Sequence, residues 1–309
     1  ISAPLYDTPR AVSTGPNWAY LRIAEGCDNR CAYCVIPSLR GKFRSRTKES
    51  ILEEARLLAA SGVKELIIVA QDITRYGIDL YGKVCLTELL KELCKLDFRW
   101  VRLHYLYPEL IDDELIDEIA SEDKIVKYLD IPIQHINDTI LRRMNRRGTG
   151  EEIRALFKKL RERIPGLVLR TSLITGLPGE GEAEFEELCD FLREAKIERA
   201  GVFPYSPEEG TPAALMPDRC STEEAQRRAE LCMEIQAEIM DGFAETFIGR
   251  ELDVLVMGRE PDGTPWGRSE YDSPDIDSRV IFSGGAAPGD MVRVRIDSVD
   301  DGELIGEQI

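Results

Sequence analysis

The chain has 309 residues, of which 43% are hydrophobic and 31% are charged, and its formal net charge is −17. This balance is typical of globular proteins and excludes disordered chains and collagen-like fibres. No run approaches the roughly 18 apolar residues of a membrane-spanning helix, and no secretory leader is evident. Eight cysteines are too few for a disulfide scaffold of this length. They favour a reducing, cytoplasmic compartment and a metal or cluster site.

The first four-fifths of the chain alternate between apolar strands and amphipathic helices. We expect strands at residues 18–24, 65–70, 100–105, 127–131, 168–174 and 200–204, and helices at 47–60, 87–96, 112–120, 151–163, 182–195 and 223–247. Thr47 should cap its helix, and Ser221 and Glu224 should form a capping box. Six such repeats predict an α/β fold whose parallel strands form an open sheet or a partial barrel. Ligands of such folds bind at the carboxyl ends of the strands.

The composition changes at about residue 248. The last 62 residues contain no lysine, 6 arginines and 14 acidic residues, so their net charge is −8. Turn sequences separate short β runs at 252–257, 279–282, 291–296 and 303–306, and this pattern predicts a small antiparallel β-barrel. We therefore expect a linker over residues 1–16, an α/β core domain over 17–247 and a β-barrel domain over 248–309.

Three cysteines stand close together after the first strand. Cys27, Cys31 and Cys34 form the sequence CDNRCAYC, with the spacing CxxxCxxC. Three thiolates on one loop can bind three irons of a 4Fe-4S cluster and leave the fourth iron open to another ligand. A structural zinc site is the alternative, but it would need a fourth ligand, and His104 and His135 are the only histidines.

This motif resembles the hallmark of the radical S-adenosylmethionine (SAM) superfamily, and the resemblance extends over residues 18–247. In that superfamily the open iron binds SAM, and the reduced cluster cleaves it to a 5′-deoxyadenosyl radical. The chain is also similar to methylthiotransferases, which carry sequences like those at 26–46, 70–77, 174–180 and 205–213 and end in a β-barrel called TRAM. The sequence IPIQH, which ends at His135, and residues 267–277 resemble the branch that modifies a ribosomal protein.

The resemblance assigns roles to particular residues. It implies that Cys27, Cys31 and Cys34 bind a 4Fe-4S cluster and that SAM is the second cofactor. It places six residues near SAM: Tyr33, Gln71, Asp72, Gln134, Thr175 and Gly176. Ordinary packing or turn formation is the alternative for each of these six. Full-length relatives carry an amino-terminal domain with three more cysteines and a second cluster. Since no cysteine precedes Cys27, we expect this chain to lack that domain.

The resemblance also implies a reaction and its partners. The enzyme would add a methylthio group to the β-carbon of an aspartate in small-subunit ribosomal protein S-twelve, with external electron and sulfur donors. A tRNA methylthiotransferase of the same family and a non-catalytic iron–sulfur electron carrier remain alternatives. The acidic tail disfavours tRNA, because tRNA binding requires neutralised phosphates, and it favours a basic protein partner. Electron carriers usually close all four iron positions.

Basic residues surround the cysteine loop and recur after the fourth strand. They are Arg30, Arg40, Lys42, Arg44, Arg46, Lys48, Arg142, Arg143, Arg146 and Arg147. They form either a solvated face or a cationic collar for a carboxylate of the cofactor or substrate. Cys189 and Cys232 fall within helices and are expected to be buried as small apolar residues. His135 is expected to form hydrogen bonds rather than to act as a base.

The cysteine assignment can be tested by anaerobic reconstitution. We expect about four irons and four sulfides per chain, because one three-cysteine site holds one cluster. Cys31→Ala should abolish cluster binding, whereas Cys189→Ala should leave it intact. Iron and sulfide analysis measures both. Zinc bound in place of iron after anaerobic purification would support the structural alternative.

Overall fold

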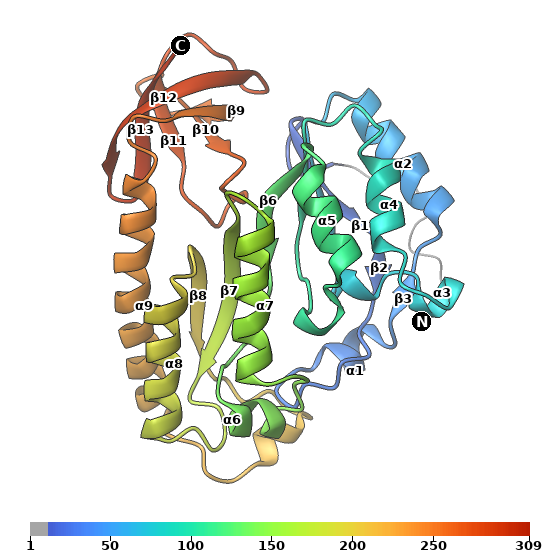
Figure 1. Cartoon of the computed structure of the whole chain (residues 1–309), viewed down its shortest axis with the longest axis vertical. Coiled ribbons are helices and arrows are strands. Elements are labelled where there is room, and N and C mark those ends of the chain that lie inside the picture. Colours follow the sequence, from blue (N-terminus) through green and yellow to red (C-terminus); the bar gives the residue numbers. More distant parts are fainter. Residues whose placement is uncertain (1–11) are drawn as a thin grey trace.

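The computed structural model describes residues 12–309, and the expected linker over residues 1–16 therefore lies mostly outside the described residues. Six strands form one parallel sheet in chain order: β1 (Trp18–Arg22), β4 (Glu65–Val69), β5 (Trp100–Leu103), β6 (Ile125–Asp130), β7 (Val168–Thr175) and β8 (Arg199–Pro204). Each strand pairs in parallel with the next. The sheet curves, with helices on its outer face (Figure 1). The predicted parallel α/β partial barrel is confirmed.

The six long helices are those that the sequence predicts. They are α2 (Lys48–Ala60), α4 (Leu86–Leu93), α5 (Asp113–Ser121), α7 (Gly150–Arg163), α8 (Glu182–Ala195) and α9 (Thr222–Glu245). The Thr47 hydroxyl caps α2 by accepting from the Ser50 amide at 3.3 Å. None of the helices in the described part of the chain has the length and hydropathy needed to cross a membrane.

The capping box expected at the start of α9 forms only in part. The Ser221 hydroxyl accepts from the Glu224 amide at 3.1 Å, as predicted. The Glu224 carboxylate instead accepts hydrogen bonds from Arg227 and Arg228, at 2.7–2.8 Å. Two guanidinium groups offer stronger, charge-assisted hydrogen bonds than one backbone amide, which explains the difference.

Short elements that the sequence does not reveal follow the carboxyl ends of the strands. They are β2 (Ala24–Glu25), β3 (Arg44–Ser45), α1 (Ile36–Arg40), α3 (Ile78–Tyr81), α6 (Asp138–Arg143) and the 3₁₀ turns η1 (Ile73–Arg75), η2 (Pro108–Leu110) and η3 (Pro212–Leu215). Each is too short for a hydrophobic period to be visible. Together they build the loops at this end of the sheet.

The two faces of the sheet differ in polarity. Leu66, Leu103 and Leu129 belong to the apolar core beneath the helices. Side chains alternate along a strand, so their neighbours Glu65, Arg102 and Tyr128 lie on the opposite, inner face. Glu65 and Arg102 are fully buried there, and the Arg102 Nε donates to Glu65 at 2.6 Å. The inner face of the sheet therefore holds buried charges.

The carboxyl-terminal residues form a closed five-stranded barrel in the order β10-β11-β13-β12-β9. Its strands are β9 (Glu251–Arg259), β10 (Pro265–Ser269), β11 (Val280–Ser283), β12 (Met291–Asp300) and β13 (Glu303–Gln308). Four pairings are antiparallel as expected, but β11 and β13 pair in parallel. The β12–β13 hairpin brings β13 back alongside β11 in the same direction, and this pairing closes the barrel. The sequence pattern does not reveal β10, because proline and glycine are rare in strands.

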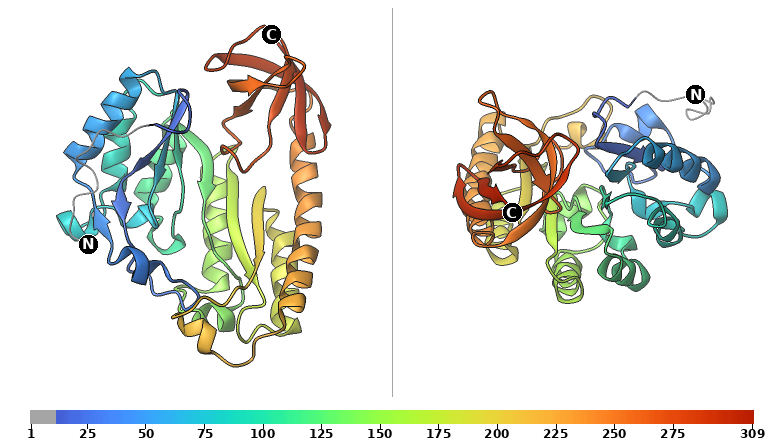
Figure 2. Two further views of the ribbon diagram at one scale, coloured as in Figure 1. Left: turned by 180° about the vertical axis from the view of Figure 1, so that it is seen from behind. Right: turned by 90° about the horizontal axis from the view of Figure 1, so that it is seen from above.

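This barrel lies at the amino ends of the parallel strands, away from α1 and α6 (Figures 1 and 2). Its Arg268 donates to Glu65 at 2.5 Å, so one buried carboxylate joins Arg102 and Arg268. The loop after β10 adds further contacts between the two domains. Arg199 donates to Asp272 at 2.8 Å, Tyr128 to Asp277 at 2.6 Å, and Ser273 bonds His104 at 3.0 Å. The barrel therefore packs on the inner face of the sheet, at the amino ends of the strands, through buried polar contacts.

Removing the central carboxylate should destabilise both domains together. In Glu65→Ala, Arg102 and Arg268 would stay buried without their counter-charge, so the free energy of unfolding should fall by about 3–5 kcal/mol. Urea denaturation of the whole chain measures this. The control is Glu251→Ala, whose pair with Arg293 is half exposed and should contribute less than about 1 kcal/mol. Equal losses in the two variants would contradict the predicted role of Glu65.

Candidate active site

The cysteine loop lies between β2 and α1 and is held by backbone hydrogen bonds. The Cys27 amide donates to Gly41 at 3.1 Å, and the Cys34 amide donates to Cys31 at 3.0 Å. Gly26 opens the loop with φ = +82°, and a Cβ there would lie 2.2 Å from the Lys42 carbonyl oxygen. Only glycine can occupy this position, because both the conformation and the close approach exclude a side chain. Backbone hydrogen bonds and the conformation of Gly26 therefore fix the shape of the cysteine loop.

All three cysteines are free thiols; Cys27 and Cys31 are buried and Cys34 is partly buried. Burial raises the pKa of Cys27 to about 11, and a bound cation would favour the thiolate form. Within residues 12–309, no three His, Cys, Asp or Glu side chains are arranged to hold a single metal ion. A closed zinc site would need a fourth protein ligand, whereas three free thiols on one loop can each bind a different iron of a cluster.

Asp72, after β4, anchors this loop. Its buried carboxylate accepts hydrogen bonds from the Asn29 side chain and the Thr74 amide, each at 3.1 Å, and from the Thr74 hydroxyl. These hydrogen bonds lower the pKa of Asp72, but burial outweighs them and the pKa is raised. These contacts hold the loop in place, and the contact of Asp72 with SAM stays a prediction. Its neighbour Gln71 differs, because its buried Oε1 has no partner among the described residues and is free to accept from a ligand.

Tyr33 and Gln134 meet at a cavity of about 320 Å³ at the carboxyl ends of β6–β8. Gln134 has φ = +73°, which few residues other than glycine adopt. Its amide donates to Ser172 at 2.9 Å and its carbonyl accepts from Ile174 at 2.8 Å, so it continues the strand pairing beyond β6. The remaining lining residues are Ser172, Ile174, Phe203, Pro204, Tyr205 and Ser206. The cavity is a largely apolar site with aromatic rings and a few polar groups beside the cysteine loop.

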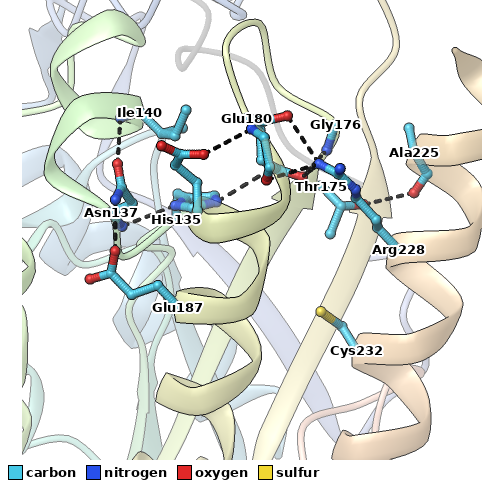
Figure 3. Close-up of polar contacts among 12 residues, drawn as sticks. His135, Asn137, Ile140, Thr175, Gly176, Glu180, Glu187, Ala225, Arg228 and Cys232 are labelled. Atoms are coloured by element: carbon cyan, nitrogen blue, oxygen red, sulfur yellow. Dashed lines mark hydrogen bonds and ion pairs between the residues drawn. The ribbon is translucent and has the colours of Figure 1, made fainter. Parts of the chain in front are cut away.

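Thr175 and Gly176 contact α9 instead. The Thr175 hydroxyl donates to the Ala225 carbonyl at 2.9 Å (Figure 3). Gly176 has φ = +75°, and a Cβ there would lie 2.4 Å from the Ala225 Cβ. These contacts position the loop after β7, and the contact of both residues with SAM stays a prediction.

A buried polar network that the sequence analysis missed holds the same loop (Figure 3). The Glu180 carboxylate accepts from the Gly176 amide at 2.8 Å and from Arg228 at 2.9 Å, and it lies 3.3 Å from His135 Nε2. Burial alone would raise the pKa of Glu180, but the contacts with His135, Gly176 and Arg228 outweigh it and lower the pKa. The other ring nitrogen of His135 accepts from the Asn137 amide at 3.0 Å, which confirms the hydrogen-bonding role expected for this histidine.

The basic residues do not form the continuous collar proposed as one alternative. Arg30, Arg146 and Arg147 line a cavity of about 220 Å³ beside Cys31. Four of the other seven pair with carboxylates: Arg40 with Glu25, Arg46 with Glu54, Lys48 with Glu88 and Arg143 with Asp218. Sequence proximity could not separate these groups, because their acidic partners come from other segments.

Two further residues approach Cys31 without a sequence signal that identified their role. Tyr107 follows β5, and its hydroxyl lies 3.6 Å from the Cys31 Sγ. Arg146 lies 3.9 Å from the same sulfur and 4.4 Å from the centre of the Tyr107 ring. The position of Tyr107 after a parallel strand was the available clue. Cys189 and Cys232 are buried between α8 and α9, as expected for packing residues.

Gly176 allows a test of how tightly this loop packs. Gly176→Ala should lower the free energy of unfolding by about 1–2 kcal/mol for the left-handed backbone and by about 1–3 kcal/mol more for the clash with α9. The control is Gly210→Ala, which has φ = +81° but nothing within 4 Å of its Cβ, and should show only the backbone cost. Chemical denaturation compares them. A variant at Gly176 no less stable than that at Gly210 would contradict the close packing.

Comparisons with known proteins agree with this architecture. A model of the radical SAM superfamily matches residues 21–192, and a model of the TRAM domain matches residues 248–309. The chain is 49% identical to the ribosomal protein uS12 methylthiotransferase RimO of Caldanaerobacter subterraneus and 52% identical to that of Pelotomaculum thermopropionicum. Each match covers 97% of this chain and 69% of the relative.

Solved structures show the same fold at low sequence identity. Coproporphyrinogen III oxidase HemN from Escherichia coli, a radical SAM enzyme, has a TM-score of 0.55 and 20% identity, over 74% of this chain and 54% of its own. The radical SAM methyltransferase TsrM from Kitasatospora setae has a TM-score of 0.53 and 20% identity, over 69% of this chain and 42% of its own. At this identity the likeness concerns the fold alone.

Proposed function

Because the chain belongs to the RimO family of ribosomal protein uS12 methylthiotransferases, within the radical SAM superfamily, we propose that it serves in methylthiolation of ribosomal protein S12. The modified atom is the β-carbon of an aspartate. The observation that carries this proposal is the loop with three free cysteines, two of them buried, at the carboxyl end of a parallel sheet.

Cys27, Cys31 and Cys34 would hold a 4Fe-4S cluster. The cluster and SAM supply the one-electron chemistry that removes a hydrogen atom from an unactivated carbon. The chain's own contribution is to position them. Gly26 and Asp72 fix the cysteine loop through the contacts described above, and the buried environment excludes water from Cys27 and Cys31.

The cavity at the ends of β6–β8 would receive SAM. Tyr33 and the exposed Phe203 offer ring faces to an adenine, and Gln134 offers both a donor and an acceptor. Gln71, which follows β4 at the same end of the sheet, has an unpartnered side-chain oxygen and is a further candidate acceptor. Thr175 and Gly176 act indirectly, since their contacts with α9 hold the loop that borders the site.

The substrate aspartate would approach the mouth that Arg30 and Arg147 line, where guanidinium groups can bind a carboxylate. The acidic barrel lies at the far end of the strands, so it would steer a basic protein at long range without contacting the target aspartate. External electron and sulfur donors complete the reaction. A second cluster would reside in the part of the relatives that this chain does not span.

Two assays test this proposal. With dithionite and SAM, the chain alone should release 5′-deoxyadenosine slowly but form no methylthiolated product, because sulfur handling requires the second cluster. A protein of the relatives' full length, carrying this sequence, should add one methylthio group to S12, detected by mass spectrometry of its peptides. Modification of tRNA in place of S12 would favour the tRNA branch. Failure to cleave SAM would favour an electron carrier.

A further inference from the structure

Arg146 is a buried cation directed at one of the cluster cysteines. Its side chain is 8% exposed. Its Nη2 donates to the Pro132 carbonyl at 2.6 Å, and its Nη1 donates to the Cys31 Sγ at 3.9 Å. The guanidinium also stacks on Tyr107, whose hydroxyl lies 3.6 Å from the same sulfur. Two polar groups therefore converge on Cys31.

The chain holds Arg146 in this place by local structure. Asn145, with φ = +53°, follows α6 and its cap residue Met144. Its side chain donates to the Arg30 carbonyl at 2.7 Å, and the Ala32 amide donates to the Met144 carbonyl at 2.8 Å. The segment that carries Arg146 is thus joined to the cysteine loop on both sides of Cys31, and it keeps the guanidinium against the sulfur.

The buried charge of Arg146 has no acidic partner among the described residues. No carboxylate lies within 4 Å of its guanidinium in residues 12–309, in contrast to the buried Arg102, Arg199 and Arg268. Its Nε also lacks a hydrogen-bond acceptor there. An unpaired buried cation costs several kcal/mol, so such groups are retained where a counter-charge is present in the working protein. The thiolate of Cys31, bound to a cluster, would supply that negative charge.

We propose that Arg146, together with Tyr107, donates to the cluster-bound sulfur of Cys31 and thereby sets the reduction potential of the cluster. This inference rests on the proposed function, since it requires the cluster. A cluster-bound sulfur carries no proton, so the Tyr107 hydroxyl must be the donor in the loaded protein. Donors and a positive charge beside the sulfur stabilise the more negative, reduced state. Arg146 is in this sense a positioning residue that favours uptake of the electron.

The test is a redox titration of the reconstituted chain without SAM or substrate, followed by electron paramagnetic resonance. Arg146→Gln should shift the potential to more negative values, by the equivalent of about tenfold in the reduction equilibrium, or about 59 mV for one electron. Tyr107→Phe should shift it in the same direction by less. Arg146→Lys keeps the charge but loses the planar fork. Its potential should therefore lie between those of the unmodified chain and Arg146→Gln.

Arg142→Gln is the matched control, because it removes the same charge from an exposed position on α6 and should leave the potential unchanged. Iron analysis confirms that each variant carries a full cluster. If Arg146→Gln fails to load, Tyr107→Phe decides the question, since it removes a single hydroxyl. Fully loaded variants at Arg146 and Tyr107 with the potential of the unmodified chain would overturn the proposal. Since no S12 is present, failure of methylthiolation would not affect this result.

Discussion

The inner face of the parallel sheet carries charges, and the rest of the structure depends on neutralising them. Glu65, Arg102 and Arg170 lie on strands whose other face packs into the apolar core. Buried charges require partners within hydrogen-bond distance, because solvation by water is lost. Apolar packing alone could not close this face. The sheet must be covered by groups that offer complementary charge at both of its ends.

At the amino ends of the strands, the carboxyl-terminal barrel meets this requirement. Arg268 completes the group around Glu65, and Asp272 neutralises Arg199. The tail is strongly acidic in sequence, yet part of that acidity is used inside the molecule. This explains why the loop after β10 is polar and yet buried, with Asp272 and Ser273 almost fully shielded from solvent. The barrel is a structural part of the core domain as well as a surface for other molecules.

At the carboxyl ends, neutralisation is incomplete within the described residues. Asp130 pairs with Arg170 and Glu180 with Arg228, but Arg146 faces the Cys31 sulfur without a carboxylate. The same end holds an unpartnered Gln71 oxygen and a cavity at Tyr33 and Gln134. Unsatisfied groups of this kind concentrate where a ligand completes the structure. The carboxyl end thus combines a buried cation that has no carboxylate partner among the described residues with a cavity beside the cysteine loop.

The sequence by itself determined the strand–helix alternation, the cysteine motif and the composition change at residue 248, because hydrophobic period, cysteine spacing and charge are local properties. Tyr33 and Gln134 could be placed near one another, since both follow parallel strands. Only the tertiary structure showed that Thr175 bonds α9, that Arg46 turns away to Glu54, and that Tyr107 and Arg146 converge on Cys31. These contacts join residues far apart in the chain, and their partners are chosen by packing and burial, which a linear pattern does not encode.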